Sequence, residues 1–227
     1  MKSRLFSLML IAAVAMGIQT LPAWADGKNW MSTVDGNTYL SRISIPGAHD
    51  AGTGHGFTGT LSTYGARFAT TQSLTITGQW NVGVRAFDLR PALLSGSNNS
   101  NADVYTDLYI WHGIIRTQQT LQTALQTLCD LLDANPTETA IVIMRHETDA
   151  YYNFTLYKNE VSNNTTYFSA KLNSMLTKDS KISSHVITNQ YADIRLKDAR
   201  GKLIILMINP NPRIPLPVFF QDLSGGI

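Results

Sequence analysis

The sequence predicts an α/β fold built on a parallel β-sheet. Strand-like runs alternate along the chain with helices or long connections, the order expected when crossovers join parallel strands. Two runs, at residues 140–144 and 202–208, are apolar without alternation, as in strands that are covered on both faces. Either a barrel or a doubly wound sheet satisfies this pattern. No strand is followed by the glycine-rich fingerprint or the phosphate-loop lysine of nucleotide-binding sheets, which lowers that option.

Residues 1–25 have the features of a secretory signal peptide. A basic start is followed by a mostly apolar stretch and by an Ala-Trp-Ala cleavage signal that ends at Ala25. The apolar stretch is short for a transmembrane anchor. We therefore expect cleavage before Asp26, a secreted or periplasmic product, and a single domain over residues 26–227.

Charge and cysteine content narrow the class of protein further. The formal net charge is +2 and there is no long basic run, so nothing indicates a nucleic-acid partner. The only cysteine, Cys129, cannot form an internal disulfide, and it lies at the edge of an apolar helical stripe. A buried core thiol is favoured over a nucleophile. We expect a monomer that is held together by its hydrophobic core.

The first half of the chain is expected to hold two strands. Residues 42–45 alternate as a short strand that a Pro-Gly pair ends. Residues 51–71 are rich in glycine and threonine and are expected to form a long loop, and residues 73–83 a short helix. The next strand covers residues 84–90. Its alternation puts four side chains on one side, namely Val84, Ala86, Asp88 and Arg90.

The second half of the chain is expected to add three strands and two helices. Residues 108–111 form a strand. Residues 118–134 form the clearest helix, with leucines at helical spacing, Thr117 as its cap and an Asn-Pro pair after its end. The remaining expected elements are a strand at 140–144, a helix at 167–176 and a strand at 202–208.

Titratable side chains follow four of these strands directly. They are His49 and Asp50, Asp88 and Arg90, His112, and Arg145 and Glu147. In a parallel barrel the carboxyl ends of the strands form one rim, where the active site lies. Two imidazoles and a guanidinium facing one cavity suit a phosphodiester, since they can remove a proton, donate a proton and stabilise phosphate charge. A metal site is disfavoured, because Arg90 lies among the possible ligands and would repel a cation.

These residues stand in stretches that resemble the bacterial phosphatidylinositol-specific phospholipases C. The matching stretches are SIPGAHDAGT at 44–53, NVGVRAFDLRP at 81–91, WHG at 111–113, NPTETAIVIMRHE at 135–147 and, more weakly, RGKLIIL at 200–206. The resemblance implies a TIM-like (β/α) barrel that cleaves phosphatidylinositol to diacylglycerol and inositol 1,2-cyclic phosphate without a metal or other cofactor. It also implies phosphatidylinositol or a glycosylated form as substrate, and transient contact with a membrane surface.

The resemblance also implies roles for the central polar residues. His49 is similar to the general base that deprotonates the inositol 2-hydroxyl, which then attacks the neighbouring phosphorus. His112 is similar to the general acid for the diacylglycerol oxygen, with Asp50 as its partner. Arg90 would take the place that calcium fills in metal-dependent relatives, and Asp88 would support it. For Asp50, a cap on the loop is the alternative.

Two further residues are expected at the inositol end of the site. Arg145 falls where the family has a basic residue that contacts the inositol, and Glu147 lies two residues beyond it. We expect both to bind the substrate. A surface ion pair between Arg145 and Glu147 is the alternative that the sequence leaves open.

The chain departs from the family pattern at its carboxyl end. A barrel of this type needs eight strands, and about five are expected here, so the domain corresponds to the N-terminal two-thirds of a barrel. The family's aspartate that orients the general base would lie beyond Ile227, and the proline-rich residues 209–227 are poorly suited to continuing the barrel. We expect a truncated or frame-shifted product that is unstable or poorly active, because an open barrel exposes two strand edges.

Other functions remain open at the level of sequence. A glycerophosphodiester phosphodiesterase would also be a barrel, but no acidic cluster follows the first strand. A non-catalytic lipid- or glycan-binding module would fit the missing barrel third. Four aromatic residues within 151–157 could contact a membrane, although packing against the outer loops is the alternative.

Overall fold

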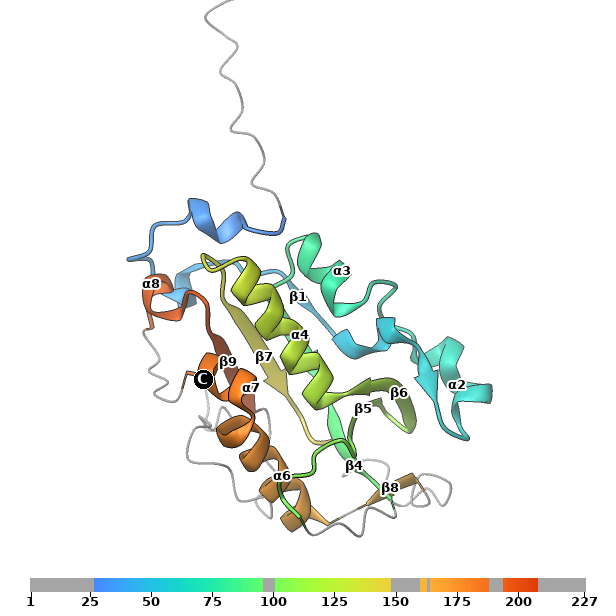
Figure 1. Cartoon of the computed structure of the whole chain (residues 1–227). Coiled ribbons are helices and arrows are strands. Elements are labelled where there is room, and N and C mark those ends of the chain that lie inside the picture. The colour runs from blue at the N-terminus through green and yellow to red at the C-terminus, as the bar shows by residue number, and fades with distance from the viewer. Residues whose placement is uncertain (1–26, 96–100, 148–159, 163, 188–193, 208–227) are drawn as a thin grey trace, which may run out of the picture.

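A four-stranded parallel sheet forms the centre of the protein (Figure 1). The computed structural model describes residues 27–95, 101–147, 160–162, 164–187 and 194–207. The strands, in their order across the sheet, are β1 (Gly47–Ala48), β3 (Ala86–Leu89), β7 (Ala140–Met144) and β9 (Leu203–Met207). The predicted α/β class with a parallel sheet is confirmed. Over the described residues β1 and β9 are the two outer strands, and the sheet does not close into a barrel.

A second sheet is antiparallel, and all of its strands except the first lie after β3 along the chain. Its strands, in their order across the sheet, are β2 (Phe57–Thr58), β6 (Ile115–Thr120), β5 (Leu108–His112), β4 (Pro91–Leu94) and β8 (Val161–Ser162). Residues 108–111 therefore form a strand, but the expectation that it joins the parallel sheet is wrong. The parallel sheet has four described strands rather than five. A tight turn at Gly113, which has φ of 56°, returns the chain as a hairpin before any crossover can form.

The first strand begins later than expected. Residues 40–42 form a 3-10 turn, η2 (Leu40–Arg42), and pairing with β3 starts only at Gly47. The Pro46 carbonyl accepts the backbone N–H groups of Arg85 and Ala86. Pro46 therefore precedes an outer strand, where its missing N–H costs little, instead of ending one. A Cβ at Gly47 would lie 3.4 Å from the Cβ of Ala86, so a small residue suits this close pairing.

The three expected helices are present with altered bounds, and the described residues form six further helical segments, η2 included. The described helices are η1 (Trp30–Thr33), η3 (Ala51–His55), α2 (Ser62–Ala69), α3 (Ile76–Asn81), α4 (Leu121–Ala134), α6 (Thr165–Lys178), α7 (Ser180–His185) and α8 (Leu196–Ala199). The cap of α4 is Thr120 and not Thr117, because residues 115–120 belong to β6. Residues 51–71 are not a long loop, since η3, β2 and α2 lie within them.

One face of the parallel sheet is covered by α3, α4, α6 and α7, and α4 lies across the strands in Figure 1. Alternate residues of β3, Phe87 and Leu89, point into this helical layer and are fully buried. Leu125 and Leu128 of α4 meet them from the apolar stripe of that helix. Cys129 is buried in the same core, as predicted.

Among the described residues, the opposite face of the sheet is covered by short helices at its amino end. There η1, η2 and α8 pack Met31, Leu40 and Leu196 against Ile204 of β9. The segment that leads to η1 is also bound by Arg85, which donates to the backbone carbonyls at positions 27 and 28 and pairs with Glu138 at 2.9 Å. The carboxyl end of this face carries Asp88 of β3, which lines a cavity there.

Several expectations lie outside the described residues. These are the signal peptide at 1–25, the aromatic loop at 151–157 and the proline-rich stretch at 209–227. Within the described part of the chain, no helix has both the length and the apolar character needed to cross a bilayer.

Candidate active site

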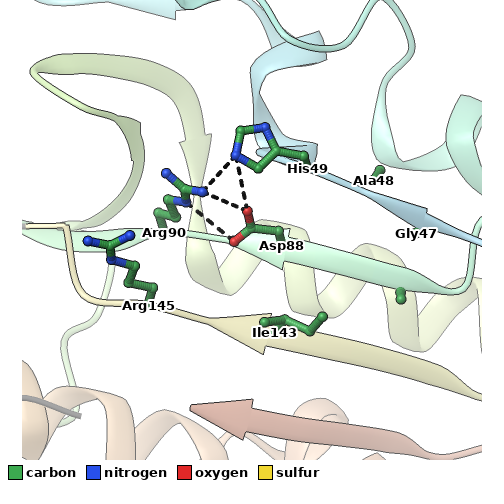
Figure 2. A pocket seen from close by; sticks show the side chains of 8 residues that line it. Gly47, Ala48, His49, Asp88, Arg90, Ile143 and Arg145 are labelled. Atoms are coloured by element: carbon green, nitrogen blue, oxygen red, sulfur yellow. Dashed lines mark hydrogen bonds and ion pairs between the residues drawn. The ribbon is translucent and has the colours of Figure 1, made fainter. Parts of the chain in front are cut away.

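A cavity of about 310 Å³ opens at the carboxyl ends of β1, β3 and β7 (Figure 2). Its lining comprises Gly47, Ala48, His49, Ala86, Asp88, Arg90, Ile143 and Arg145. The floor is apolar and the rim is charged. The predicted alternation of β3 accounts for this, because Ala86, Asp88 and Arg90 face the cavity while their neighbours face the helices.

Asp50 reaches this cavity through an unusual backbone conformation. Its φ of 47° and ψ of 52° are left-handed, and it is the only non-glycine residue with positive φ among the described residues. In an extended strand, His49 and Asp50 would point to opposite faces. The left-handed turn brings both side chains into one cluster, and aspartate tolerates this conformation better than most residues.

The guanidinium of Arg90 is the positive centre of the cluster. Its Nη2 donates to Asp88 Oδ2 at 3.0 Å, and its Nε lies 2.9 Å from Asp50 Oδ1. The backbone N–H of Asp50 also donates to Asp88 Oδ2, at 3.3 Å. Asp88 therefore fixes both Arg90 and the turn that carries Asp50.

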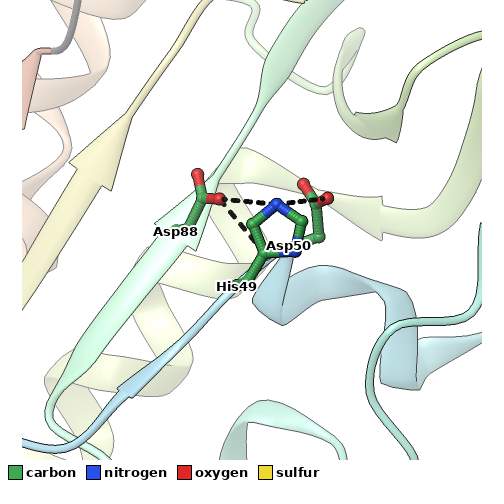
Figure 3. Close-up of side chains that lie close together, drawn as sticks. All are labelled: His49, Asp50 and Asp88. Carbon is green, nitrogen blue, oxygen red and sulfur yellow. Dashed lines mark hydrogen bonds and ion pairs between the residues drawn. The ribbon is translucent and has the colours of Figure 1, made fainter.

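His49 lies between the two carboxylates, with its side chain 63% exposed (Figure 3). Its Nε2 is 3.3 Å from Asp50 Oδ2 and 2.8 Å from Arg90 Nη2. A guanidinium has only donors, so we assign the lone pair of the neutral imidazole to Nε2. In this tautomer His49 Nε2 is the hydrogen-bond acceptor for Arg90 Nη2.

His112 arrives from the end of β5, in the antiparallel sheet. Its Nε2 lies 3.2 Å from Asp50 Oδ2, and its ring centroid is 6.5 Å from that of His49. Because a carboxylate only accepts, this contact suits a proton on His112 Nε2. Burial lowers the pKa of His112, Arg90 lowers it further, and the Glu147 carboxylate opposes this. His49 Nε2 therefore accepts a hydrogen bond from Arg90, whereas His112 Nε2 directs its proton toward Asp50.

Arg145 and Glu147 follow β7 and differ in their surroundings. Arg145 is exposed on the cavity rim, on the same side of the sheet as Arg90 (Figure 2). Glu147 is buried, accepts the backbone N–H of Gly113 at 2.9 Å and lies 3.8 Å from Arg90 Nη1. Glu147 is therefore directed toward the β5–β6 turn and Arg90, and it is not among the residues that line the cavity.

A metal ion is a poor fit to this cluster. His49, Asp50 and Asp88 offer three ligand atoms within 4.8 Å of one another, the only such group among the described residues. The Arg90 guanidinium already lies within 3.0 Å of an atom of each of them. A cation would have to displace a guanidinium that cannot lose its charge.

Two residues that hold the site were not predicted from the sequence. Gln72 Nε2 donates to the backbone carbonyl of His49 at 2.8 Å, and Thr71 Oγ1 donates to the same carbonyl at 3.2 Å. Both follow α2 and fix the backbone of β1 where it ends. No motif marks them, since the contact joins residues 22 and 23 positions apart.

The described residues are similar to known enzymes. No protein-family model matches the chain. The 1-phosphatidylinositol phosphodiesterase of Listeria monocytogenes serovar 1/2a is 30% identical over 191 residues, which cover 80% of this chain and 49% of that protein. The chain spans about half the length of the curated relatives it matches.

Solved structures share the fold. A double mutant of the phosphatidylinositol-specific phospholipase C from Staphylococcus aureus has a TM-score of 0.61 at 23% identity, covering 80% of this chain and 52% of that one. A structure on modulation of membrane binding of the same enzyme has a TM-score of 0.60 at 23% identity, covering 80% and 53%. The fold is therefore that of an incomplete TIM-like barrel, as predicted.

The buried carboxyl of Asp50 makes stability depend on pH. Burial raises its pKa from 3.8 to about 6, although Arg90 opposes the shift. The folded protein thus binds this proton more tightly than the unfolded chain. The resulting stabilisation is complete below the unfolded value and is lost as the pH rises through about 6.

We predict that Asp50→Asn stabilises the protein at neutral pH. Asparagine stays neutral and suits the left-handed backbone. The free energy of unfolding of the variant should match the wild type near pH 4 and exceed it by roughly 3 kcal/mol near pH 7. Urea unfolding across this range measures the difference. A variant that is less stable at neutral pH would contradict the assignment of a raised pKa.

Proposed function

Because this chain is a homologue of the bacterial 1-phosphatidylinositol phosphodiesterases over about four fifths of its length, we propose that it cleaves phosphatidylinositol as a phospholipase C. The products are diacylglycerol and inositol 1,2-cyclic phosphate. The observation that carries the proposal is the convergence of His49, Arg90 and His112 around Asp50. The 6.5 Å between the two imidazole rings lets both reach oxygens bonded to one phosphorus.

In the proposed reaction, His49 Nε2 takes the proton of the inositol 2-hydroxyl. The hydroxyl oxygen forms a bond to phosphorus, and the bond from phosphorus to the diacylglycerol oxygen breaks. His112 gives its Nε2 proton to that leaving oxygen. A phosphate oxygen replaces His49 as the partner of Arg90 Nη2, which frees the imidazole and neutralises charge that gathers in the transition state.

The electrostatics of the cluster support this division of labour. Asp50 Oδ2 lies where it can accept the Nε2 proton of His112, and Arg90 Nη2 donates toward His49 Nε2. Asp88 fixes the guanidinium through its Nη2. Arg145 stands on the cavity rim, where its charge suits a hydroxyl-rich, anionic headgroup. No step requires a metal. The guanidinium of Arg90 would repel the cation that a glycerophosphodiester phosphodiesterase needs.

A second candidate function is a non-catalytic binding protein derived from the same barrel. The observation that favours it is that the parallel sheet does not close into a barrel over the described residues. Such a protein would bind the inositol headgroup in the same cavity without turnover. In either case we expect export after cleavage near Ala25, a monomer, and phosphatidylinositol or its glycosylated form as the ligand.

Membrane contact is the other part of the proposal. Phe68 on α2 is 73% exposed, and the Arg67 guanidinium lies 4.5 Å from its ring. The next residue, Ala69, lies beside His112 and raises its pKa through the backbone. The exposed ring therefore stands near the site, next to a positive charge that suits an anionic lipid surface.

We predict metal-independent cleavage that depends on both imidazoles. The purified mature chain should release cyclic inositol phosphate from phosphatidylinositol in EDTA, and His49→Ala and His112→Ala should each lower kcat by at least about 100-fold. His185→Ala is a matched control, because His185 pairs with Asp133 and lies outside the cavity. Loss of activity in EDTA would contradict the scheme, and headgroup binding without turnover supports the second candidate.

We also predict that Phe68→Ala weakens binding to phosphatidylinositol-containing vesicles by about tenfold, because an aromatic ring is withdrawn from the lipid. Val82→Ala is the matched control, since Val82 is 66% exposed but precedes β3 at the end away from the cavity. Vesicle co-sedimentation measures both. Equal losses in the two variants, or none, would remove α2 as the contact surface.

A further inference from the structure

The parallel sheet does not hold the His112 side chain in place, so another contact must do so. His112 ends β5 of the antiparallel sheet, so the register of β1, β3 and β7 does not fix it. It stands at the two-residue turn between β5 and β6, where Gly113 has positive φ. A hairpin turn that projects over a cavity can move unless a contact from outside the hairpin holds it.

Glu147 provides such a contact from the end of β7. Its Oε1 accepts the backbone N–H of Gly113 at 2.9 Å. Its own backbone N–H donates to the carbonyl of Pro91 at 3.3 Å, which anchors it where β4 begins. The side chain is only 4% exposed, so water competes little for this hydrogen bond.

We propose that Glu147 is a positioning residue that holds the β5–β6 turn and thereby keeps the His112 imidazole against Asp50. Its meaning for catalysis rests on the proposed function. The assignment differs from the expectation drawn from the sequence, in which Glu147 binds the substrate. A carboxylate used in this way joins the parallel sheet, which carries His49 and Arg90, to the hairpin that carries the second imidazole.

The charge of Glu147 adds an electrostatic effect to the geometric one. His112 faces Asp50, Arg90, His49 and Glu147. Burial, Arg90 and His49 lower the pKa of His112, whereas Glu147 and the backbone at Ala69 raise it. Glu147 thus helps His112 to keep the proton that a general acid must donate.

Two substitutions separate the geometric effect from the electrostatic one. Glu147→Gln keeps an oxygen that can accept from Gly113 but removes the charge, and Glu147→Ala removes both. Glu160→Gln is the matched control, because Glu160 also accepts a backbone N–H, that of Thr60 at 2.7 Å, away from the cavity. Three readouts are needed: the His112 pKa by NMR titration, hydrogen exchange of the Gly113 amide, and the separate values of kcat and KM.

We expect Glu147→Gln to lower the His112 pKa while the Gly113 amide stays protected. The alkaline limb of the kcat profile should then move to lower pH. Glu147→Ala should also speed Gly113 exchange and lower kcat by about 100-fold, with KM little changed. Glu160→Gln should alter none of these values.

The NMR readouts do not require turnover, so an inactive wild type would count against the proposed function alone. If Glu147→Ala does not fold, Glu147→Met, which fills the side-chain volume but cannot accept from Gly113, takes its place in the hydrogen-exchange measurement. An unchanged pKa with a protected Gly113 amide in both variants, or a raised KM at constant kcat, would overturn the positioning role.

Discussion

The carboxylate of Asp50 lies where the two sheets meet, and the arrangement of the site depends on it. One oxygen lies 2.9 Å from Arg90, and the other lies 3.2 Å from His112 and 3.3 Å from His49. The side chain is 1% exposed, and neither oxygen has an aligned hydrogen bond among the described residues. Burying such a charge is costly, and the guanidinium offsets part of this cost. The carboxylate is therefore held by charge, in a position where small changes in its partners alter both imidazoles.

The fixed guanidinium of Arg90 gives this cluster a positive charge together with hydrogen-bond donors, which a metal ion does not supply. Arg90 keeps its charge at all physiological pH values and presents several donors in one plane. Asp88 and Asp50 hold two of its edges, and Arg90 lines the cavity. The cavity floor of Ala86 and Ile143 excludes competing polar groups. A tetrahedral anion is the ligand that such a surface matches, which connects the alternation of one short strand to phosphodiester chemistry.

Much of this could be predicted from the sequence, because the signals are local. The alternation of β3 predicted which side chains face the cavity, and the apolar runs of β7 and β9 predicted parallel strands. The sheet that carries His112 could not be predicted correctly, since the apolar run of β5 has the same composition as a parallel strand. Only its pairing with β4 and β6 distinguishes the two.

The contacts that hold the site together were also hidden. Gly113 and Glu147 are 34 residues apart, and Gln72 and His49 are 23 apart, so no spacing rule connects them. The left-handed backbone of Asp50 was equally hidden, because aspartate adopts this conformation only where its surroundings require it. The sequence motifs identified the residues of the site. Hydrogen bonds between residues far apart in the sequence determine how those residues are arranged.

The central claim is that two imidazoles and one guanidinium act on a single phosphate. NMR titration of the histidine-labelled chain with myo-inositol 1-phosphate tests it most directly. The account predicts that the His49 and His112 resonances shift together along one saturating curve, and that both shifts disappear in Arg90→Met. Separate curves, or a shift of only one imidazole, would contradict it.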